Sequence, residues 1–300
     1  MLRHANGRWL KGRIIGGRKG QALVAATMLT ALLTTLGACG GGGSDGESTQ
    51  HPSGENEIVL QVFSGGGFVP VSYSLTEIPQ FTLYGDGTVI VTGPVIAIYP
   101  GPAMPNLQTT RIPEEAVQEI LSAAQEAGLF TNGVDYGQPG ITDIPTTTII
   151  VNAGGKSYRS DIYALGMEAG AGGLTMEQQQ ARAVINDLVG KLGVLADYVP
   201  GEIEWTEYAY TQLKVFSMAV DPSAAPDDEV KPNELVWPLG DLSTLGQAVP
   251  PEGYRSVVVS GDDLAKLKPL LADATQITLW TSGDRRYNLS FRPLLPDETA

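Results

Sequence analysis

The feature that most constrains the fold is a set of three glycine-containing turns, each of which joins two short strand-like segments. These segments and turns are 81–83 and 88–91 around 84–87, 147–151 and 158–162 around 154–155, and 276–280 and 287–291 around 282–284. Glycine supplies the positive φ angles that tight connections require, so the sequence predicts three antiparallel hairpins. In the last hairpin Ile277 and Leu279 fall on one face. Tyr287, Leu289 and Phe291 do the same on the second strand, which predicts one buried side.

Three amphipathic segments interrupt the strands. Their apolar stripes are Val117, Ile120, Leu121 and Ala124; Ala181, Val184, Ile185, Leu188 and Leu192; and Leu264, Leu267 and Leu271. Spacing of this kind predicts a helix in each case. The first helix is expected to start after Pro113 and to stop at Gly128. The second has Thr175 as its N-cap and stops at Gly193, while Pro269 should kink or shorten the third.

Few helices among many short strands predict an α+β fold of antiparallel strands and hairpins with about three helices. The sequence Leu-Gln-Val-Phe-Ser at 60–64 recurs as Leu-Lys-Val-Phe-Ser at 213–217, and a helix and then a hairpin follow each copy. This echo indicates either two related strand-helix-hairpin units or chance similarity. The expected domains are an α+β domain at 57–198 and a second α+β unit at 205–298. Regular βα alternation and a glycine-rich phosphate motif are both missing from the sequence, which disfavours a nucleotide-binding fold.

The first 38 residues have the charge-then-apolar order of a secretory signal. Residues 1–19 are polar and basic, and 22–36 form a fifteen-residue run of Ala, Leu, Val, Met and Thr. A membrane-spanning helix needs about 20 apolar residues, so an uncleaved transmembrane anchor is the weaker interpretation. The sequence predicts a signal peptide at 1–38.

The end of this run, Leu36-Gly37-Ala38-Cys39, resembles the lipobox of bacterial lipoproteins. The resemblance implies that Cys39 receives diacylglycerol and fatty acyl chains such as palmitate, and that it anchors the chain at the extracytoplasmic face of the cell membrane. Two or three acyl chains suffice, because each buried methylene is worth about 0.8 kcal/mol. The alternatives are a lone buried cysteine or a signal cleaved after Ala38 without lipid. The stretch 39–56, rich in glycine and serine, is predicted to be a flexible tether.

The basic residues cluster in the leader, which leaves an acidic body. Six of the 19 basic side chains and none of the 33 acidic ones precede Cys39, so the chain from Cys39 onward has 13 basic against 33 acidic side chains and a formal charge of −20. Phosphate backbones repel such a body, and we expect no nucleic-acid partner. His4, His51 and Cys39 lie in the leader or the tether. This placement excludes His- or Cys-dependent nucleophilic catalysis, zinc sites with those ligands and disulfides from the folded part, and no cofactor or metal is predicted.

Three segments at 81–90, 112–121 and 143–149 together resemble a pattern seen in uncharacterised bacterial envelope lipoproteins and related domains of unknown function. The resemblance covers residues 57 to 195. It implies no catalytic residues, because that family has no assigned activity.

The segment 94–105 contains four prolines, which favour a stiff and poorly paired loop. Its candidate partner-binding residues are Ile96, Ile98, Tyr99 and Met104, because such a loop can present apolar side chains to another protein. The favoured alternative is a structural loop over a sheet edge, with Ile96, Ile98 and Tyr99 tucked into the core.

Acidic residues near aromatic rings give a further candidate. Glu202, Glu204 and Glu207 lie close in sequence to Trp205 and Tyr208. Glycosidases use two carboxyl groups, and sugars stack on aromatic rings, so this cluster is a candidate carbohydrate site. The favoured interpretation is a solvated acidic linker between two units.

Two other groups have simple structural interpretations. Asp221 and the acidic run 227–229 lack the regular spacing of a calcium loop and are expected to form a surface loop. Trp237 and Trp280 are expected to be core anchors rather than ligand platforms.

The sequence therefore predicts a lipid-anchored extracytoplasmic lipoprotein that acts as a non-catalytic binding or structural module of the cell envelope. Its expected partners are the membrane, through lipid on Cys39, and an envelope protein or small ligand. The alternative is a carboxylate-dependent hydrolase such as a glycosidase, with two carboxyl groups in one cleft and one raised pKa. A solute receptor of a transporter is disfavoured by the scarcity of helices.

Overall fold

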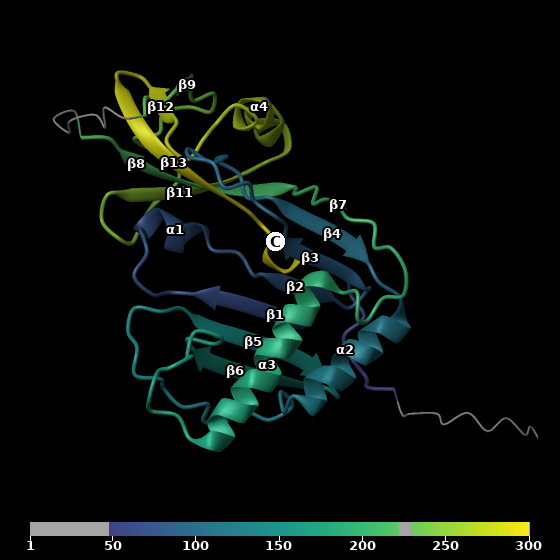
Figure 1. Ribbon diagram of the computed structural model, residues 1–300. Helices are drawn as coiled ribbons and strands as arrows, with labels where there is room; N and C mark the ends of the chain where they lie inside the picture. The colour runs from purple at the N-terminus through teal and green to yellow at the C-terminus, as the bar shows by residue number, and fades with distance from the viewer. Residues whose placement is uncertain (1–47, 222–229, 300) are drawn as a thin grey trace, which may run out of the picture. The chain divides into compact units, whose positions relative to one another are not determined.

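The computed structural model describes residues 48–221 and 230–299, which form two β-sheets and four α-helices (Figure 1). Neighbouring strands within this part of the chain run antiparallel, except for one short parallel pair at an edge of the second sheet. The architecture is α+β with sheet as its main content, which confirms the predicted fold class at that level.

The first sheet has seven strands in the order β6-β5-β1-β2-β3-β4-β7. The strands are β1 (Ile58–Gly65), β2 (Phe81–Tyr84), β3 (Thr88–Thr92), β4 (Leu107–Arg111), β5 (Thr146–Ala153), β6 (Lys156–Tyr163) and β7 (Thr206–Glu207). Helices α2 (Glu114–Glu126) and α3 (Met176–Val194) lie across one face, and the short helix α1 (Val71–Thr76) follows β1 (Figure 1). The core between them includes Leu60, Val62 and Ile120, all fully buried.

The second sheet has six strands in the order β10-β11-β8-β13-β12-β9. The strands are β8 (Gln212–Ala219), β9 (Glu234–Val236), β10 (Gln247–Val249), β11 (Tyr254–Ser260), β12 (Leu279–Ser282) and β13 (Arg285–Pro293), and helix α4 (Gly261–Leu271) packs on them. The rings of Trp237 and Trp280 meet edge to face at 5.9 Å, and Trp280 meets Phe291 at 5.7 Å. Both tryptophans are buried, so their prediction as core anchors is confirmed.

All three expected hairpins form, as β2–β3, β5–β6 and β12–β13. The last one differs from the prediction, since its first strand begins at Leu279 rather than at residue 276. The backbone before it pairs elsewhere: the Gln276 amide donates to the Gly101 carbonyl at 3.0 Å. Trp280 therefore pairs with Tyr287 on the buried face, and Leu279 is only half-buried.

The three expected helices also form, and residues at their ends explain where they stop. After α2 the amides of Gly128 and Leu129 donate to the carbonyls of Gln125 and Ala124, respectively. This is the Schellman pattern, and Gly128 has the positive φ, 80°, that it requires. Helix α4 contains Pro269 and ends two residues later, at Leu271.

Helix α3 starts with the capping box of Thr175 and Gln178 but departs from the prediction twice. Val184 is 46% exposed, and the fully buried Arg182 faces the interior instead. The helix also continues past Gly193 to Val194. Leu195, which is buried, takes the left-handed cap position with a φ of 54°.

The end of the chain connects the two sheets. Leu294 and Leu295 leave β13 and are buried, and Leu295 packs with Tyr84, Ile90 and Leu107 of the first sheet. The described residues, 48–221 and 230–299, belong to one unit by their contacts. The separate folding of 57–198 and 205–298 stays a prediction.

Candidate functional site

The predicted lipid-attachment residue Cys39 and the lipobox residues Leu36, Gly37 and Ala38 lie outside the described residues. Their role stays a prediction from the sequence. Within 48–221 and 230–299, no helix is both long and apolar enough to span a bilayer.

The loop at 94–105 is the first candidate site in the described body. The side chains of Ile96, Ile98 and Tyr99 are 67%, 57% and 69% exposed, and that of Val95 is 72% exposed. The expectation that these side chains are tucked into the core is therefore wrong. Met104 differs from them, because it is half-buried against the core of the second sheet. The loop has an apolar tip and a buried base.

Hydrogen bonds fix both ends of this loop. At its start, the Asn106 side chain donates to the Pro94 carbonyl at 2.7 Å, and the Gly93 amide donates to the Asn106 carbonyl at 2.8 Å. At its end, the Ala103 amide donates to the Ala274 carbonyl at 3.0 Å, next to a bridge between Pro102 and Thr275. The exposed tip therefore projects from a held backbone. Sequence alone missed this, since residues 274–276 are distant in the chain.

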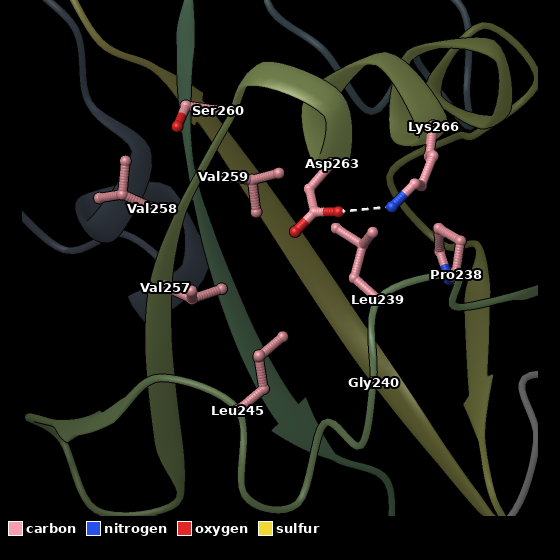
Figure 2. Close-up of a pocket in the computed structure, with 10 residues that line it drawn as sticks. All are labelled: Pro238, Leu239, Gly240, Leu245, Val257, Val258, Val259, Ser260, Asp263 and Lys266. Atoms are coloured by element: carbon pink, nitrogen blue, oxygen red, sulfur yellow. Dashed lines mark hydrogen bonds and ion pairs between the residues drawn. The ribbon is translucent and has the colours of Figure 1, made fainter.

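The second candidate is a pocket of about 410 Å³ in the second sheet, between α4, β11 and the loop that follows β9 (Figure 2). Leu239, Leu245 and Val257 form its apolar wall. Asp263 and Lys266 lie at its α4 side and form an ion pair of 2.8 Å. The hydrogen bond with Asp263 raises the pKa of the Lys266 ammonium group. This pocket has one carboxyl group, whereas a glycosidase needs two.

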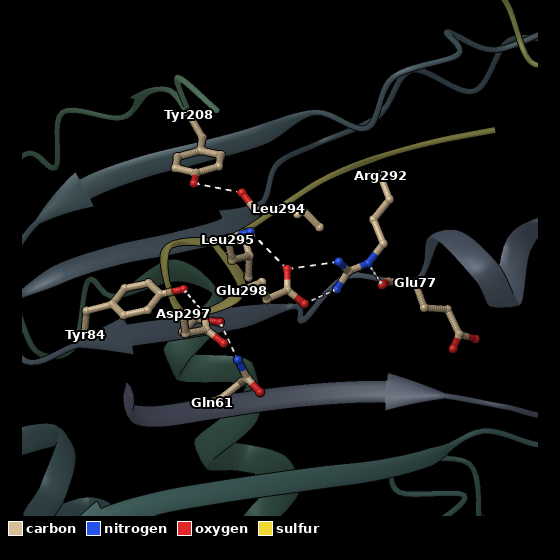
Figure 3. Close-up of polar contacts among 10 residues, drawn as sticks. Gln61, Glu77, Tyr84, Tyr208, Arg292, Leu294, Leu295, Asp297 and Glu298 are labelled. Carbon is tan, nitrogen blue, oxygen red and sulfur yellow. Dashed lines mark hydrogen bonds and ion pairs between the residues drawn. The ribbon is translucent and has the colours of Figure 1, made fainter. Parts of the chain in front are cut away.

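A third candidate is the polar cluster at the end of β13 (Figure 3). The Nε of Arg292 donates to the Glu77 carbonyl at 2.8 Å, and its two Nη atoms donate to both carboxylate oxygens of Glu298 at 2.9 and 2.5 Å. Glu298 also accepts from the Leu295 amide at 2.9 Å. Each of the three guanidinium nitrogens has a protein acceptor, so the arrangement holds the turn that follows β13.

Two tyrosines complete this cluster. The Tyr84 hydroxyl donates to the Asp297 carboxylate at 2.6 Å, and the Tyr208 hydroxyl donates to the Leu294 carbonyl at 3.0 Å (Figure 3). Burial raises the pKa of Tyr208 to about 12, and burial with the Asp297 bond raises the pKa of Tyr84 still further. Both hydroxyls stay protonated at neutral pH, which suits hydrogen-bond donors rather than general bases.

The sequence reading missed a buried ion pair on α3. Arg182 is fully buried and its Nε donates to Glu168 at 3.0 Å. Its Nη atoms donate to the carbonyls of Tyr136, Tyr163 and Ala164 at 3.3, 2.7 and 3.0 Å. Burial acts to raise the pKa of Glu168, but the hydrogen bonds and the positive charge of Arg182 lower it overall. The only sequence signal was an arginine beside the apolar stripe of a helix.

The predicted acidic candidates do not come together. Glu202, Glu204 and Glu207 are exposed on the segment between α3 and β8, as a solvated linker would be. Asp221 is exposed, and 227–229 lie outside the described residues. In the part of the chain that the structure describes, no three His, Cys, Asp or Glu side chains are grouped to hold a metal ion.

The carboxyl groups with shifted pKa values share one direction. Burial opposes ionisation at Glu114 and Glu168, yet hydrogen bonds to the carboxylate lower the pKa of Glu114, Asp161, Glu168, Glu177 and Asp241. A glycosidase acid needs the opposite shift. None of these five side chains therefore has the property of that acid.

Comparison with known proteins adds no assignment: no family model, no curated protein and no solved structure matches this chain.

Proposed function

We propose that this protein is a lipid-anchored extracytoplasmic lipoprotein whose body is a non-catalytic binding or structural module of the cell envelope. Support for the anchor comes from the basic leader 1–19, the apolar run 22–36 and the lipobox-like sequence that ends at Cys39. In this proposal lipid on Cys39 holds the body at the cell membrane, and the part of the predicted tether before residue 48 gives it reach.

The rest of the predicted tether lies against the body instead. Thr49 exchanges two hydrogen bonds with the Gln118 side chain, and the Gly154 amide donates to the Gln50 carbonyl at 2.7 Å. The Nε2 of His51 lies 3.1 Å from a carboxylate oxygen of Glu114, so this histidine belongs to the folded part.

The observation that carries the binding role is the exposed tip of the loop 94–105. Four apolar side chains, Val95, Ile96, Ile98 and Tyr99, are each more than half exposed. Bonds at both ends hold the backbone, so a partner that covers the tip orders few additional groups and little conformational entropy is lost. Adjacent exposed apolar side chains of this kind mark interaction surfaces.

The partner is an envelope protein rather than a nucleic acid. The formal charge of −20 after Cys39 repels phosphate groups, and the loop tip offers apolar contact without cations. A small ligand is the second partner class.

We also propose that the two sheets contain related strand-helix-hairpin units. The repeated sequences lie in β1 and β8, each in the interior of its sheet, and in both the Leu and Val positions are buried: Leu60, Val62, Leu213 and Val215. The hairpin after α2 pairs with β1 through its first strand, whereas the hairpin after α4 pairs with β8 through its second. If the two units share an origin, the strand of the hairpin that pairs with β1 or β8 must have changed in one of them after the duplication.

The loop is tested with Ile96→Ser, Ile98→Ser and Tyr99→Ser combined in the full chain. We expect capture of the envelope partner from detergent-solubilised membranes to be lost. The free energy of unfolding should change by less than about 0.5 kcal/mol per site, because exposed side chains contribute little to folding.

The matched control combines Met176→Ser, Val184→Ser and Val194→Ser, three exposed apolar residues on α3. This variant should capture the partner as the parent chain does. Equal capture by the loop variant and the parent would contradict the assignment of the loop.

A further inference from the structure

Strand β11 is only partly covered on its outer side. The ladder between β10 and β11 pairs Gln247 with Ser256 and goes no further along β11. On its inner side β11 pairs with β8 over its whole length, to Ser260. Among the described residues, the outer edge from Val257 to Ser260 therefore has no neighbouring strand.

Two observations show which main-chain groups point outward along this edge. The Tyr254 amide donates to the Pro251 carbonyl, on the β10 side. A methyl group added to Gly246 would collide with the Ser256 carbonyl oxygen, so that oxygen also points outward. Antiparallel strands alternate inward and outward groups, which places the N–H and C=O of Val258 on the open edge and those of Val257 and Val259 toward β8.

The space beside this edge is the pocket of about 410 Å³. The side chains of Val257 and Val259 point toward Leu239 and Leu245, while that of Val258 points away (Figure 2). Val258 thus contributes its main chain to the wall. The volume lies in the range of about 300–1,000 Å³ that is typical of binding sites.

Arg255 fixes the other side of this space. Its guanidinium donates to the carbonyls of Thr244, Leu245 and Gly246 at 3.0, 3.0 and 2.7 Å. These bonds hold residues 244–246 where this loop turns away from β11. Because the loop is held there, the edge beside Val258 stays open.

The other sheet edges are protected in ways that this one is not. Strands β7, β9 and β10 have only two or three residues each. Strand β6 has Lys156, Arg159 and Asp161. The Asn132 side chain donates from its Nδ2 to the Ser157 carbonyl and accepts at its Oδ1 from the Arg159 backbone amide. Charged residues and short length block the addition of a strand. Residues 257–259 are three consecutive valines.

We propose that the outer edge of β11 from Val257 to Ser260 binds an extended cationic peptide segment as an added β-strand. Main-chain hydrogen bonds to Val258 supply the affinity, and one apolar side chain enters the pocket between Leu239 and Leu245. The site is separate from the loop 94–105 and does not depend on the function proposed for that loop.

The charge of the protein favours a cationic peptide over a second copy of the chain. A second copy would bring another body of charge −20 to the edge, and the two like charges would repel each other. The first turn of α4, beside the pocket, contains Asp262 and Asp263, and the next turn contains Lys266, which pairs with Asp263. These three side chains together carry a net negative charge. A peptide with Lys or Arg near its ends is attracted by both the local and the total charge.

The test uses the full chain in detergent and the acetylated, amidated hexapeptide Lys-Val-Thr-Val-Thr-Lys. We expect saturating peptide to slow hydrogen exchange of the Val258 amide at least about tenfold, as a newly bonded amide does. The Val257 and Val259 amides, which already pair with β8, should keep their rates. This alternation distinguishes strand addition from general stabilisation.

Val258→Pro removes the outward donor without removing a bond to β8, and proline is tolerated at such edge positions. It should weaken peptide binding about fivefold or more, as expected for one lost hydrogen bond, whereas Val258→Thr should bind as the parent chain does. A hexapeptide N-methylated at its central residues tests the same bonds without changing the protein, and it too should bind more weakly.

Four results would overturn the proposal. The first is a Val258 amide that already exchanges slowly without peptide, and the second is unchanged affinity for Val258→Pro or for the methylated peptide. The third is an acidic peptide, Glu-Val-Thr-Val-Thr-Glu, that binds as tightly as the basic one. The fourth is self-association of the chain through this edge, measured by sedimentation. The loop variant with three serines should bind the hexapeptide normally, so failure of one proposal leaves the other standing.

Discussion

At the scale of single residues, Arg182 makes the most demanding interaction, because a fully buried guanidinium needs several acceptors. Replacing it in Arg182→Leu leaves Glu168 and three carbonyls without their donor. We expect the free energy of unfolding to fall by about 3–5 kcal/mol in denaturant titrations at pH 7. The control is Arg159→Leu, which breaks the exposed pair with Asp161 and should cost less than about 1 kcal/mol. Equal losses in the two variants would contradict a special role for the buried pair.

The pair of Arg182 and Glu168 also makes the stability of the fold depend on pH, and the sign follows from the pKa of Glu168. The pKa of Glu168 is lower in the folded chain than in the unfolded chain, where a glutamate has a pKa of about 4.3. Its contribution to stability is therefore present above that unfolded value and is lost as the pH falls through the folded value. The difference in stability between the parent chain and Arg182→Leu should shrink below about pH 4.

At the scale of elements, two glycines near helix ends should respond oppositely to alanine. Gly128 has a φ of 80° after α2, and Gly193 lies within α3 with open space around its Cα. Gly128→Ala should destabilise the chain by about 1 kcal/mol, since alanine avoids the left-handed region. Gly193→Ala should stabilise it by about 0.5–1 kcal/mol, because glycine is a poor helix former. Thermal unfolding of the two variants measures both signs, and a shared sign would contradict the assigned helix ends.

At the scale of the whole molecule, the proposed lipid anchor on Cys39 predicts that the protein is found with membranes. In Cys39→Ser no thiol is available for lipid, and the described body has no helix that could span a bilayer. We expect the variant to leave the membrane fraction for the soluble fraction, as measured by ultracentrifugation and immunoblotting. A Ser44→Ala variant in the tether should remain with the membranes. Membrane partitioning of Cys39→Ser equal to that of the parent would refute the anchor.

The sequence by itself determined the hairpins and most helix ends, because turn chemistry and capping act within a few residues. Gly154 and Gly155 join β5 to β6 as expected, and Thr175 caps α3. Burial of Ile185, Leu188 and Leu192 on α3 also followed from periodicity, although Val184 of the same predicted stripe is exposed.

Only the tertiary structure decided which segments distant in the chain meet. Gln276 bonds to Gly101, which moves the start of β12 to Leu279. The tip of the loop 94–105 is exposed, including Ile96, and the β10–β11 ladder ends at Ser256. The tertiary structure also gave Arg182 its acceptors from three separate segments. Contacts of this kind depend on how two sheets and their loops pack together, and the local patterns in a sequence contain no information about that packing.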